Sequence, residues 1–252
     1  MKKIPEITIL FWIMKICATT LGETAGDLLS MTMSVGYAVS SMILISIFLI
    51  TLIIQLMSKK YNPIIYWLVI LSTSTAGTTM SDYMDRTLGL GYATGSLILI
   101  SILLVVFALW RISEKSLSVT NITTFKGELF YWIAILFSNT LGTAVGDYLA
   151  DDSGLGFLGG ALLIGSLLTM VVLAKYFTKI SIVLLFWIAF VLTRPFGATF
   201  GDLLTKSSEH GGLNFGTTGS SLILFVMLVI LVAYSYFNKN KLKESIIDRS
   251  LK

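Results

Sequence analysis

Long apolar stretches alternate with short polar segments along the whole chain. Eight of them contain the ~20 residues that a helix needs to cross the ~30 Å hydrocarbon layer of a bilayer. The pattern predicts helices near residues 7–29, 35–57, 63–85, 90–111, 127–150, 154–174, 180–205 and 213–237. The expected fold is therefore all-α and integral to the membrane, with eight transmembrane helices and short loops.

The eight stretches form four copies of one two-helix unit. Tryptophan recurs at Trp12, Trp67, Trp132 and Trp187, and each is followed ten residues later by glycine and fifteen residues later by aspartate. The four motifs read LGETAGDLL, AGTTMSDYM, LGTAVGDYL and FGATFGDLL. Each unit contains an A helix, which carries this motif, a tight turn, and a more apolar B helix. Four copies at fixed spacing predict a repeat architecture.

The repeats span residues 6–58, 62–112, 126–175 and 180–238, within a single membrane domain of residues 1–252. A basic segment, residues 239–252, follows the last repeat. Each repeat crosses the membrane twice, so that all four insert in the same orientation. We therefore expect four parallel two-helix repeats with a pseudo-symmetry axis along the membrane normal, as in parallel-repeat transporters.

The four Trp-to-Asp segments carry a resemblance that covers nearly the whole chain. The sequence resembles a bacterial membrane family of four tandem repeats of unknown function, each with two transmembrane segments and a marker tryptophan. The resemblance implies the architecture described above, and it implies no biochemical activity.

The distribution of basic residues predicts the orientation in the membrane. Lysine and arginine are concentrated before the first helix, after each B helix and in the C-terminal segment, whereas the turns at the other end hold only Arg86 and Lys206, beside four acidic residues. Positively charged loops stay in the cytoplasm. We therefore expect a multi-pass protein of the bacterial inner membrane with cytoplasmic N- and C-termini.

Composition agrees with a membrane protein and excludes several other classes. The chain is 55% hydrophobic and 13% charged, with a mean hydropathy of +0.86, whereas a soluble domain has ~25% charged residues. The net charge of +4 reflects the basic loops and does not indicate nucleic-acid binding. One cysteine, Cys17, excludes a disulfide framework and a cysteine-rich metal site. No cofactor is expected.

Each A helix carries a polar stripe that ends in its aspartate. Residues three, four, seven and eight positions before the aspartate share one helix face, so we expect the A helices to face one another and the B helices to face lipid. The predicted substrate or ion pathway consists of Glu23, Asp27, Asp82, Asp147, Asp202, Arg194, Thr78, Thr143 and Asn139. The aspartates Asp27, Asp82, Asp147 and Asp202 are the candidate metal ligands.

Two interpretations of this stripe remain open. Its small residues are also typical of close helix packing in membranes, where Ser and Thr hydrogen-bond between helices. Ionisable residues at membrane depth are costly, however, and they usually mark ion or substrate pathways. Oxygen ligands favour hard ions such as Mg²⁺, Mn²⁺ or Ca²⁺, and protons are equally compatible with the carboxylates.

The four repeats carry different residues in the polar stripe, whereas a symmetric pore would need no such differences. Glu23 is present only in the first repeat, and the Arg194-Pro195 pair only in the fourth, where proline should kink the helix. This asymmetry favours a transporter of a small cation, either a hard divalent metal or a proton-coupled species, over a channel. A non-transporting scaffold or sensor, or a transporter of a small organic solute, are the alternatives.

The sequence contains no Ser-His pair and no HExxH motif that would indicate an enzyme, and we do not expect one. The expected partners are the lipid bilayer and the small cation or solute, and a homo-oligomer is compatible with the sequence. The four tryptophans are expected to anchor or pack near the cytoplasmic interface. Lys15, one turn deeper than Trp12, is expected to extend its ammonium back to that surface.

Overall fold

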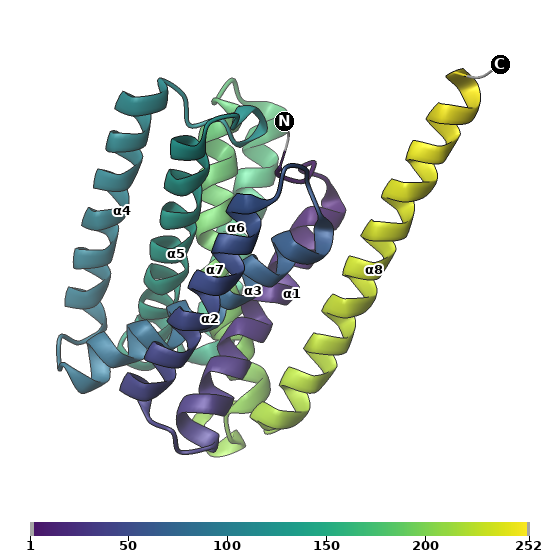
Figure 1. Cartoon of the computed structure of the whole chain (residues 1–252). Coiled ribbons are helices and arrows are strands. Elements are labelled where there is room, and N and C mark those ends of the chain that lie inside the picture. Colours follow the sequence, from purple (N-terminus) through teal and green to yellow (C-terminus); the bar gives the residue numbers. More distant parts are fainter. Residues whose placement is uncertain (1–2, 251–252) are drawn as a thin grey trace.

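The computed structural model describes residues 3–250, apart from the side chains of Asn121, His210 and residues 239–250. The described chain contains eight α-helices (Figure 1). They are α1 (Ile9–Asp27), α2 (Tyr37–Met57), α3 (Pro63–Asp82), α4 (Tyr92–Glu114), α5 (Phe125–Asp147), α6 (Gly156–Phe177), α7 (Ile182–Thr205) and α8 (Thr217–Ser250). All eight expected helices are present, and apart from the C-terminal end of α8 their ends differ from the prediction by a few residues.

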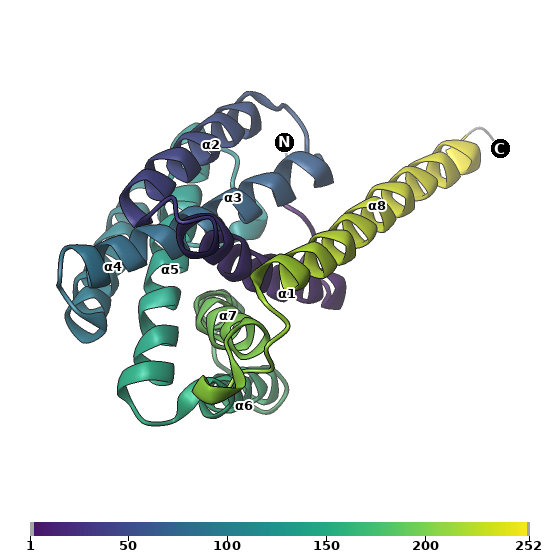
Figure 2. The same ribbon diagram turned by 90° about the horizontal axis from the view of Figure 1, so that it is seen from below.

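The last helix departs most from the prediction. We expected it to end near residue 237 and a basic tail to follow, but α8 continues to Ser250 and projects beyond the bundle (Figures 1 and 2). The side chains of the basic residues in this extension lie outside the described part of the chain.

Local sequence signals explain where many of the helices begin. Thr8, Asn62 and Thr124 cap three of the A helices, because each side chain accepts a hydrogen bond from a free backbone N–H in the first turn. The B helices α2 and α4 each follow a glycine with positive φ, Gly36 and Gly91, a conformation that glycine adopts without strain. The A helices α1, α3 and α5 continue into π-helical turns at Leu28–Thr32, Tyr83–Thr87 and Tyr148–Asp152.

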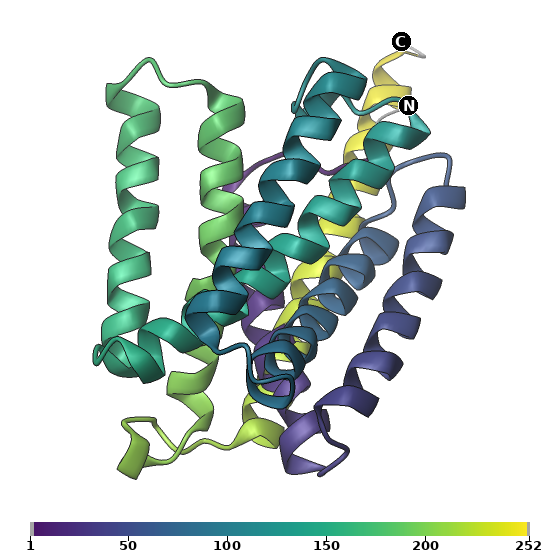
Figure 3. The same ribbon diagram turned by 90° about the vertical axis from the view of Figure 1, so that its left-hand side faces the viewer.

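The four A helices α1, α3, α5 and α7 form a closed ring. Helix α1 packs against α3 and α7, and α5 packs against the same two helices from the opposite side. Each B helix covers the A helix of the following repeat, so that α2 packs on α3, α4 on α5, α6 on α7, and α8 on α1 (Figure 2). The last repeat therefore completes the first, and the connections lie at the two ends of the bundle (Figure 3).

The glycines of the motif allow this ring to close. The glycine that follows each motif tryptophan by ten residues lies against the next A helix around the ring. It contacts the residue of that helix that follows the helix's own tryptophan by seven positions. The four contacts are Gly22 with Ser74, Gly77 with Asn139, Gly142 with Arg194, and Gly197 with Thr19. A Cβ atom on Gly197 would lie 2.6 Å from the Thr19 hydroxyl, which is too close for any side chain. The packing interpretation of the motif is therefore confirmed for its glycines.

The bundle has the outer surface of a membrane protein. Helices α2, α4, α5, α6, α7 and the first part of α8 are long and apolar enough to span a bilayer. In the four B helices only 22–28% of the most apolar stretch is buried inside the protein, against 67% in α5 and 56% in α7. Helices α1 and α3 are not among these six candidate membrane-spanning helices, because their polar residues lower their mean hydropathy. The chain is a multi-pass membrane protein in which the A helices face inward.

Aromatic residues fill the half of the ring from which the A helices begin. Trp67, Trp132 and Trp187 are buried, and the hydroxyls of Tyr66 and Tyr131 lie 2.6 Å apart in the same core. Only Trp12 among the four motif tryptophans is half-buried. The tryptophans of repeats two to four therefore pack inside the bundle.

Candidate functional site

The four motif aspartates gather at the end of the ring opposite the aromatic core. Asp27, Asp82 and Asp147 are the last residues of α1, α3 and α5, and Asp202 lies one turn before the end of α7. Each is at most 5% exposed. Because the repeats are in the same register, equal spacing along the sequence places the four carboxylates at the same height.

Two basic residues divide these aspartates into pairs. Arg86 lies 3.0 Å from Asp82 and 3.4 Å from Asp147, measured from guanidinium nitrogen to carboxylate oxygen. Lys206 Nζ lies 2.8 Å from Asp27 and 3.2 Å from Asp202. Each cation therefore bridges the aspartate of its own repeat, four residues earlier, and the aspartate of the next repeat around the ring.

The environment of Lys206 keeps its ammonium charged. Burial by itself would lower the pKa of this group, but the nearby carboxylates of Asp202 and Asp27 raise it above the ordinary value of 10.5. Lys206 follows the last residue of α7, at the end of the bundle. It therefore remains a permanent counter-ion of the two aspartates at physiological pH.

Arg194 is bound to all three of the other A helices in the middle of the ring. Its Nη1 donates to Glu23 Oε2 of α1 at 2.9 Å, and its Nη2 donates to Thr78 of α3 at 2.5 Å and to Thr143 of α5 at 2.6 Å. Arg194 is 0% exposed and Glu23 3%. The structure thus brings together four of the predicted pathway residues: Glu23, Arg194, Thr78 and Thr143.

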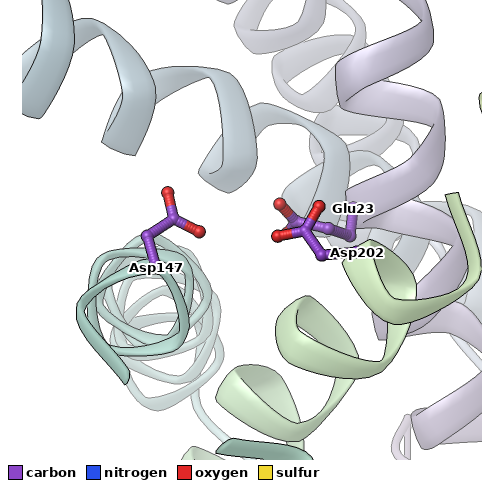
Figure 4. A group of neighbouring side chains, drawn as sticks. All are labelled: Glu23, Asp147 and Asp202. Carbon is purple, nitrogen blue, oxygen red and sulfur yellow. The ribbon is translucent and has the colours of Figure 1, made fainter. Parts of the chain in front are cut away.

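Glu23 also links this layer to the aspartates. One carboxylate oxygen from each of Glu23, Asp147 and Asp202 lies within 4.8 Å of the other two. In Figure 4, Asp147 projects from α5 toward Glu23 and Asp202, which come from α1 and α7. We call these three residues the carboxylate cluster. Each is paired with one base: Arg194 with Glu23, Arg86 with Asp147, and Lys206 with Asp202.

The structure thus changes the composition of the predicted metal-binding group. We expected the four aspartates to form one group of ligands, but the cluster contains only two of them, Asp147 and Asp202. Asp27 and Asp82 are nearby and share Lys206 and Arg86 with them. Glu23 takes part because its side chain is longer and begins one turn earlier on α1, so that it reaches toward the same centre.

Asn139 belongs to a separate polar contact at the level of Lys15. The Asn139 side chain accepts a hydrogen bond from Lys15 Nζ at 3.3 Å and donates one to Thr73 at 3.0 Å. The Lys15 ammonium lies 4.0 Å from the centre of the Phe190 ring. Lys15 is 0% exposed, so the expectation that it reaches the cytoplasmic surface is wrong. It points into the ring because α3, α5 and α7 surround α1 on that face.

Sequence reasoning missed the roles of Arg86 and Lys206, which it treated only as charges in the outer turns. Their common spacing of four residues after an aspartate is the signal that was available, because residues four apart lie on one helix face. It also missed a buried contact at the other end of the bundle. There Glu128 accepts hydrogen bonds from Lys3 at 2.6 Å and from Gln55 at 3.2 Å.

The charges at the candidate site leave an excess of carboxylates. Among the side chains that the structure describes, Glu23 and the four motif aspartates pair with three bases, Arg86, Arg194 and Lys206. Two negative charges therefore remain without a paired base if all five carboxylates are ionised. Carboxylate and hydroxyl oxygens are ligands that suit hard cations, and buried carboxylates also bind protons.

Comparison with known families agrees with the repeat architecture. A family model described as Repeat of Unknown Function (DUF347) matches four segments, residues 10–61, 65–116, 130–181 and 185–241. No curated protein and no solved structure matches the chain. The matched segments coincide with the four predicted repeats, each of which holds one A helix and one B helix.

Proposed function

We propose that this chain, which belongs to the DUF347 family of repeats of unknown function, is a membrane transporter of a small cation. The cation passes through the polar centre between the four A helices and is bound by the carboxylate cluster of Glu23, Asp147 and Asp202. The observation that carries the proposal is that three carboxylates from three different helices approach within 4.8 Å of one another. Such an arrangement of like charges is costly unless cations or protons balance it.

The chemistry of the centre supports a hard cation. The cluster offers carboxylate oxygens, and the hydroxyls of Thr78 and Thr143 lie 3.3 and 3.4 Å from Glu23. Among divalent ions, Mg²⁺, Mn²⁺ and Ca²⁺ prefer such oxygen ligands. The excess of two carboxylates over bases matches the charge of one divalent ion, and it equally matches two protons that exchange against it.

The proposal includes a topology in which all eight helices cross the membrane. Helices α1 and α3 are less apolar than the others, but their polar residues are buried inside the bundle, against the other A helices or the covering B helices. The basic loops then lie in the cytoplasm together with both termini, and the carboxylate cluster lies toward the outer face. Four parallel repeats around an axis along the membrane normal, in the inner membrane of a bacterium, complete this arrangement.

A scaffold or sensor is the main alternative, because the same ion pairs also hold the helices together. A transporter of an organic solute is the other. These two alternatives can be distinguished from the proposal by one measurement, because neither of them predicts that the metal content of a cell depends on the carboxylate cluster.

The test compares the elemental content of cells that express the wild type or Asp147→Asn at equal membrane levels, across a panel of divalent salts. A transporter changes the content of one metal, and the variant abolishes this change because it removes one charge from the cluster. Asp152→Asn is the matched control, since this exposed aspartate lies in the same outer turn. An unchanged content of every metal contradicts the divalent-ion proposal.

A further inference from the structure

We propose that the Arg194 guanidinium occupies the place of the transported cation at Glu23 and seals the ring in this conformation. This inference rests on the proposed cation transport and assigns Arg194 the role of a tethered competitor. A cation can then be bound by Glu23 only after the guanidinium has moved away. Arg194 is thus a positioning residue that controls access to the carboxylate.

The contacts of Arg194 support a seal across the ring. The side chain starts on α7 and reaches α1, α3 and α5, where it donates to the backbone carbonyls of Thr19 and Ser74, each at 3.4 Å, and to the Glu23, Thr78 and Thr143 side chains. Because one guanidinium touches every other A helix, no route along the ring axis passes this level without displacing it.

The residues around Arg194 are adapted to hold it there. Gly142 lies against the Cβ and Cγ atoms of Arg194, and a side chain at this position would occupy the same space. In the other three repeats the position of Arg194 holds Thr19, Ser74 and Asn139, which are smaller and uncharged. The fourth repeat therefore has a long cationic side chain at the position where each of the other three repeats has a short polar one.

Two features show how Arg194 could leave this position. Its Nε is buried without a hydrogen-bond partner, so that one of the five donors of the guanidinium group is unsatisfied and the site is not fully matched to arginine. The next residue is Pro195, which lies inside α7. Proline cannot donate a backbone hydrogen bond inside a helix, and helices bend most readily at such a point, so the backbone that carries Arg194 is the part of α7 best suited to bend.

One helical turn from Arg194 toward the aromatic core, the ring is closed by a layer of four side chains, which we call the layer below Arg194. Lys15 on α1 corresponds to Ile70, Ile135 and Phe190 on the other A helices, three residues after each tryptophan, and all four are 0% exposed. Removing Arg194 therefore deepens the polar centre by one layer and does not open a continuous channel.

The first experiment measures Mn²⁺ binding to the purified full chain in nanodiscs, from the loss of the free-ion electron paramagnetic resonance signal. We expect Arg194→Gln to bind Mn²⁺ at least tenfold more tightly than the wild type, because Glu23 is then free. The double variant Glu23→Gln/Arg194→Gln should lose this gain. If the wild type binds Mn²⁺ and folded Arg194→Gln binds it equally or more weakly, the proposal is overturned.

A second variant covers the case in which Arg194→Gln does not fold because Glu23 is left buried without its partner. Arg194→Lys keeps the charge, but a single ammonium cannot bind Glu23, Thr78 and Thr143 in the same geometry. We expect it to fold and to bind Mn²⁺ at least threefold more tightly than the wild type. If the wild type binds Mn²⁺, binding of equal strength by Arg194→Lys overturns the role of the guanidinium.

A thiol measurement tests the seal without any need for ion transport. A Cys17→Ser background with Ile135→Cys places one thiol in the layer below Arg194, and a charged methanethiosulfonate probes it in nanodiscs. The thiol should be protected when Arg194 is present and should react at least tenfold faster with Arg194→Ser, while a control thiol, Ser153→Cys in the outer turn, reacts equally in both backgrounds.

The two measurements separate the inference from the proposed function. Protection of Ile135→Cys that does not change with Arg194→Ser overturns the seal, whatever the protein transports. Loss of protection without Mn²⁺ binding by any variant supports the seal and contradicts the role of the cluster as a divalent-ion site.

Discussion

Lys206 Nζ lies 2.8 Å from Asp27 Oδ2, although 179 residues separate the two along the chain. The contact joins the end of α7 to the end of α1 and so links the fourth repeat to the first. Arg86 makes the equivalent contact between the second and third repeats, at 3.4 Å from Asp147. The two halves of the chain are therefore held together at this end by ion pairs at the same position of the repeat.

Replacing Lys206 by glutamine should lower the free energy of unfolding by on the order of 2 kcal/mol. The carboxylates of Asp27 and Asp202 would lose their shared cation, and removing one partner of a buried pair is costly, although partial exposure of Lys206 reduces the loss. Thermal unfolding in detergent measures the effect. Lys179→Gln, at an exposed connection, is the control, and equal destabilisation by both would contradict the bridge.

The same pair predicts a pH dependence. The pKa of Lys206 is raised above its ordinary value of 10.5 in the folded protein. The stabilisation of the folded state by its ammonium is therefore fully present below pH 10.5, and it is lost only as the pH rises through the higher pKa of the folded state. The difference in stability between the wild type and Lys206→Gln should therefore stay constant from about pH 7 to 9. A difference that declines within this range would show that the ammonium is not held by the two aspartates.

The motif glycines should tolerate no side chain where the A helices meet. Gly197→Ala would place a Cβ atom 2.6 Å from the Thr19 hydroxyl, and we expect overpacking to cost ~1–3 kcal/mol. Gly219→Ala on α8 is the matched control, since no atom lies within 4 Å of its Cβ position. Melting temperatures of the two variants decide the point, and an unchanged value for Gly197→Ala would contradict the close contact between α7 and α1.

Much of the fold could be predicted from the sequence because the repeat constrains many positions at once. Four copies of one motif at fixed spacing establish the helix pairs, and the polar stripe correctly places the A helices inside. The packing of each B helix on the next A helix could not be predicted, because no sequence feature says which neighbouring helix covers which. The π-helical turns also carry no recognisable signal.

The sequence predicted most residues of the candidate site, but it did not predict which charged residues form ion pairs with one another. Glu23, Arg194, Thr78 and Thr143 share a face of their helices with the aspartates, and the structure brings them together as the pattern suggested. The bridges made by Arg86 and Lys206 could not be predicted, because both residues lie beyond the ends of α3 and α7, where the path of the chain does not follow from helix spacing. The burial of Lys15 depends on three helices closing around it, which sequence spacing does not specify.

The buried tryptophans should contribute to stability according to their position in the bundle. Trp132 is 0% exposed, whereas Trp12 is half-buried. Trp132→Ala should cost ~3–5 kcal/mol, as expected for a large side chain removed from a core, and Trp12→Ala clearly less. Unfolding in a mild detergent compares the two. Similar losses would contradict the expectation that the more deeply buried tryptophan contributes more.

The contact between Lys3 and Glu128 should hold the N-terminal segment against the bundle. Lys3 Nζ also donates to the Leu56 carbonyl at 3.0 Å, so Lys3→Gln should free the segment before α1. Hydrogen–deuterium exchange is expected to rise severalfold in residues 4–12 and to stay unchanged in residues 20–27. Unchanged exchange in the first segment would show that this contact does not fasten the N-terminus.

Cation flux through the purified protein tests the proposed transport most directly. Proteoliposomes with an entrapped dye that Mn²⁺ quenches would contain the wild type, Asp147→Asn or the control Asp152→Asn at equal amounts. We predict Mn²⁺ uptake by the wild type and the control, and uptake at the level of empty liposomes for Asp147→Asn. Equal uptake by the wild type and Asp147→Asn, or none by the wild type for any divalent ion or proton gradient, would contradict transport through the carboxylate cluster.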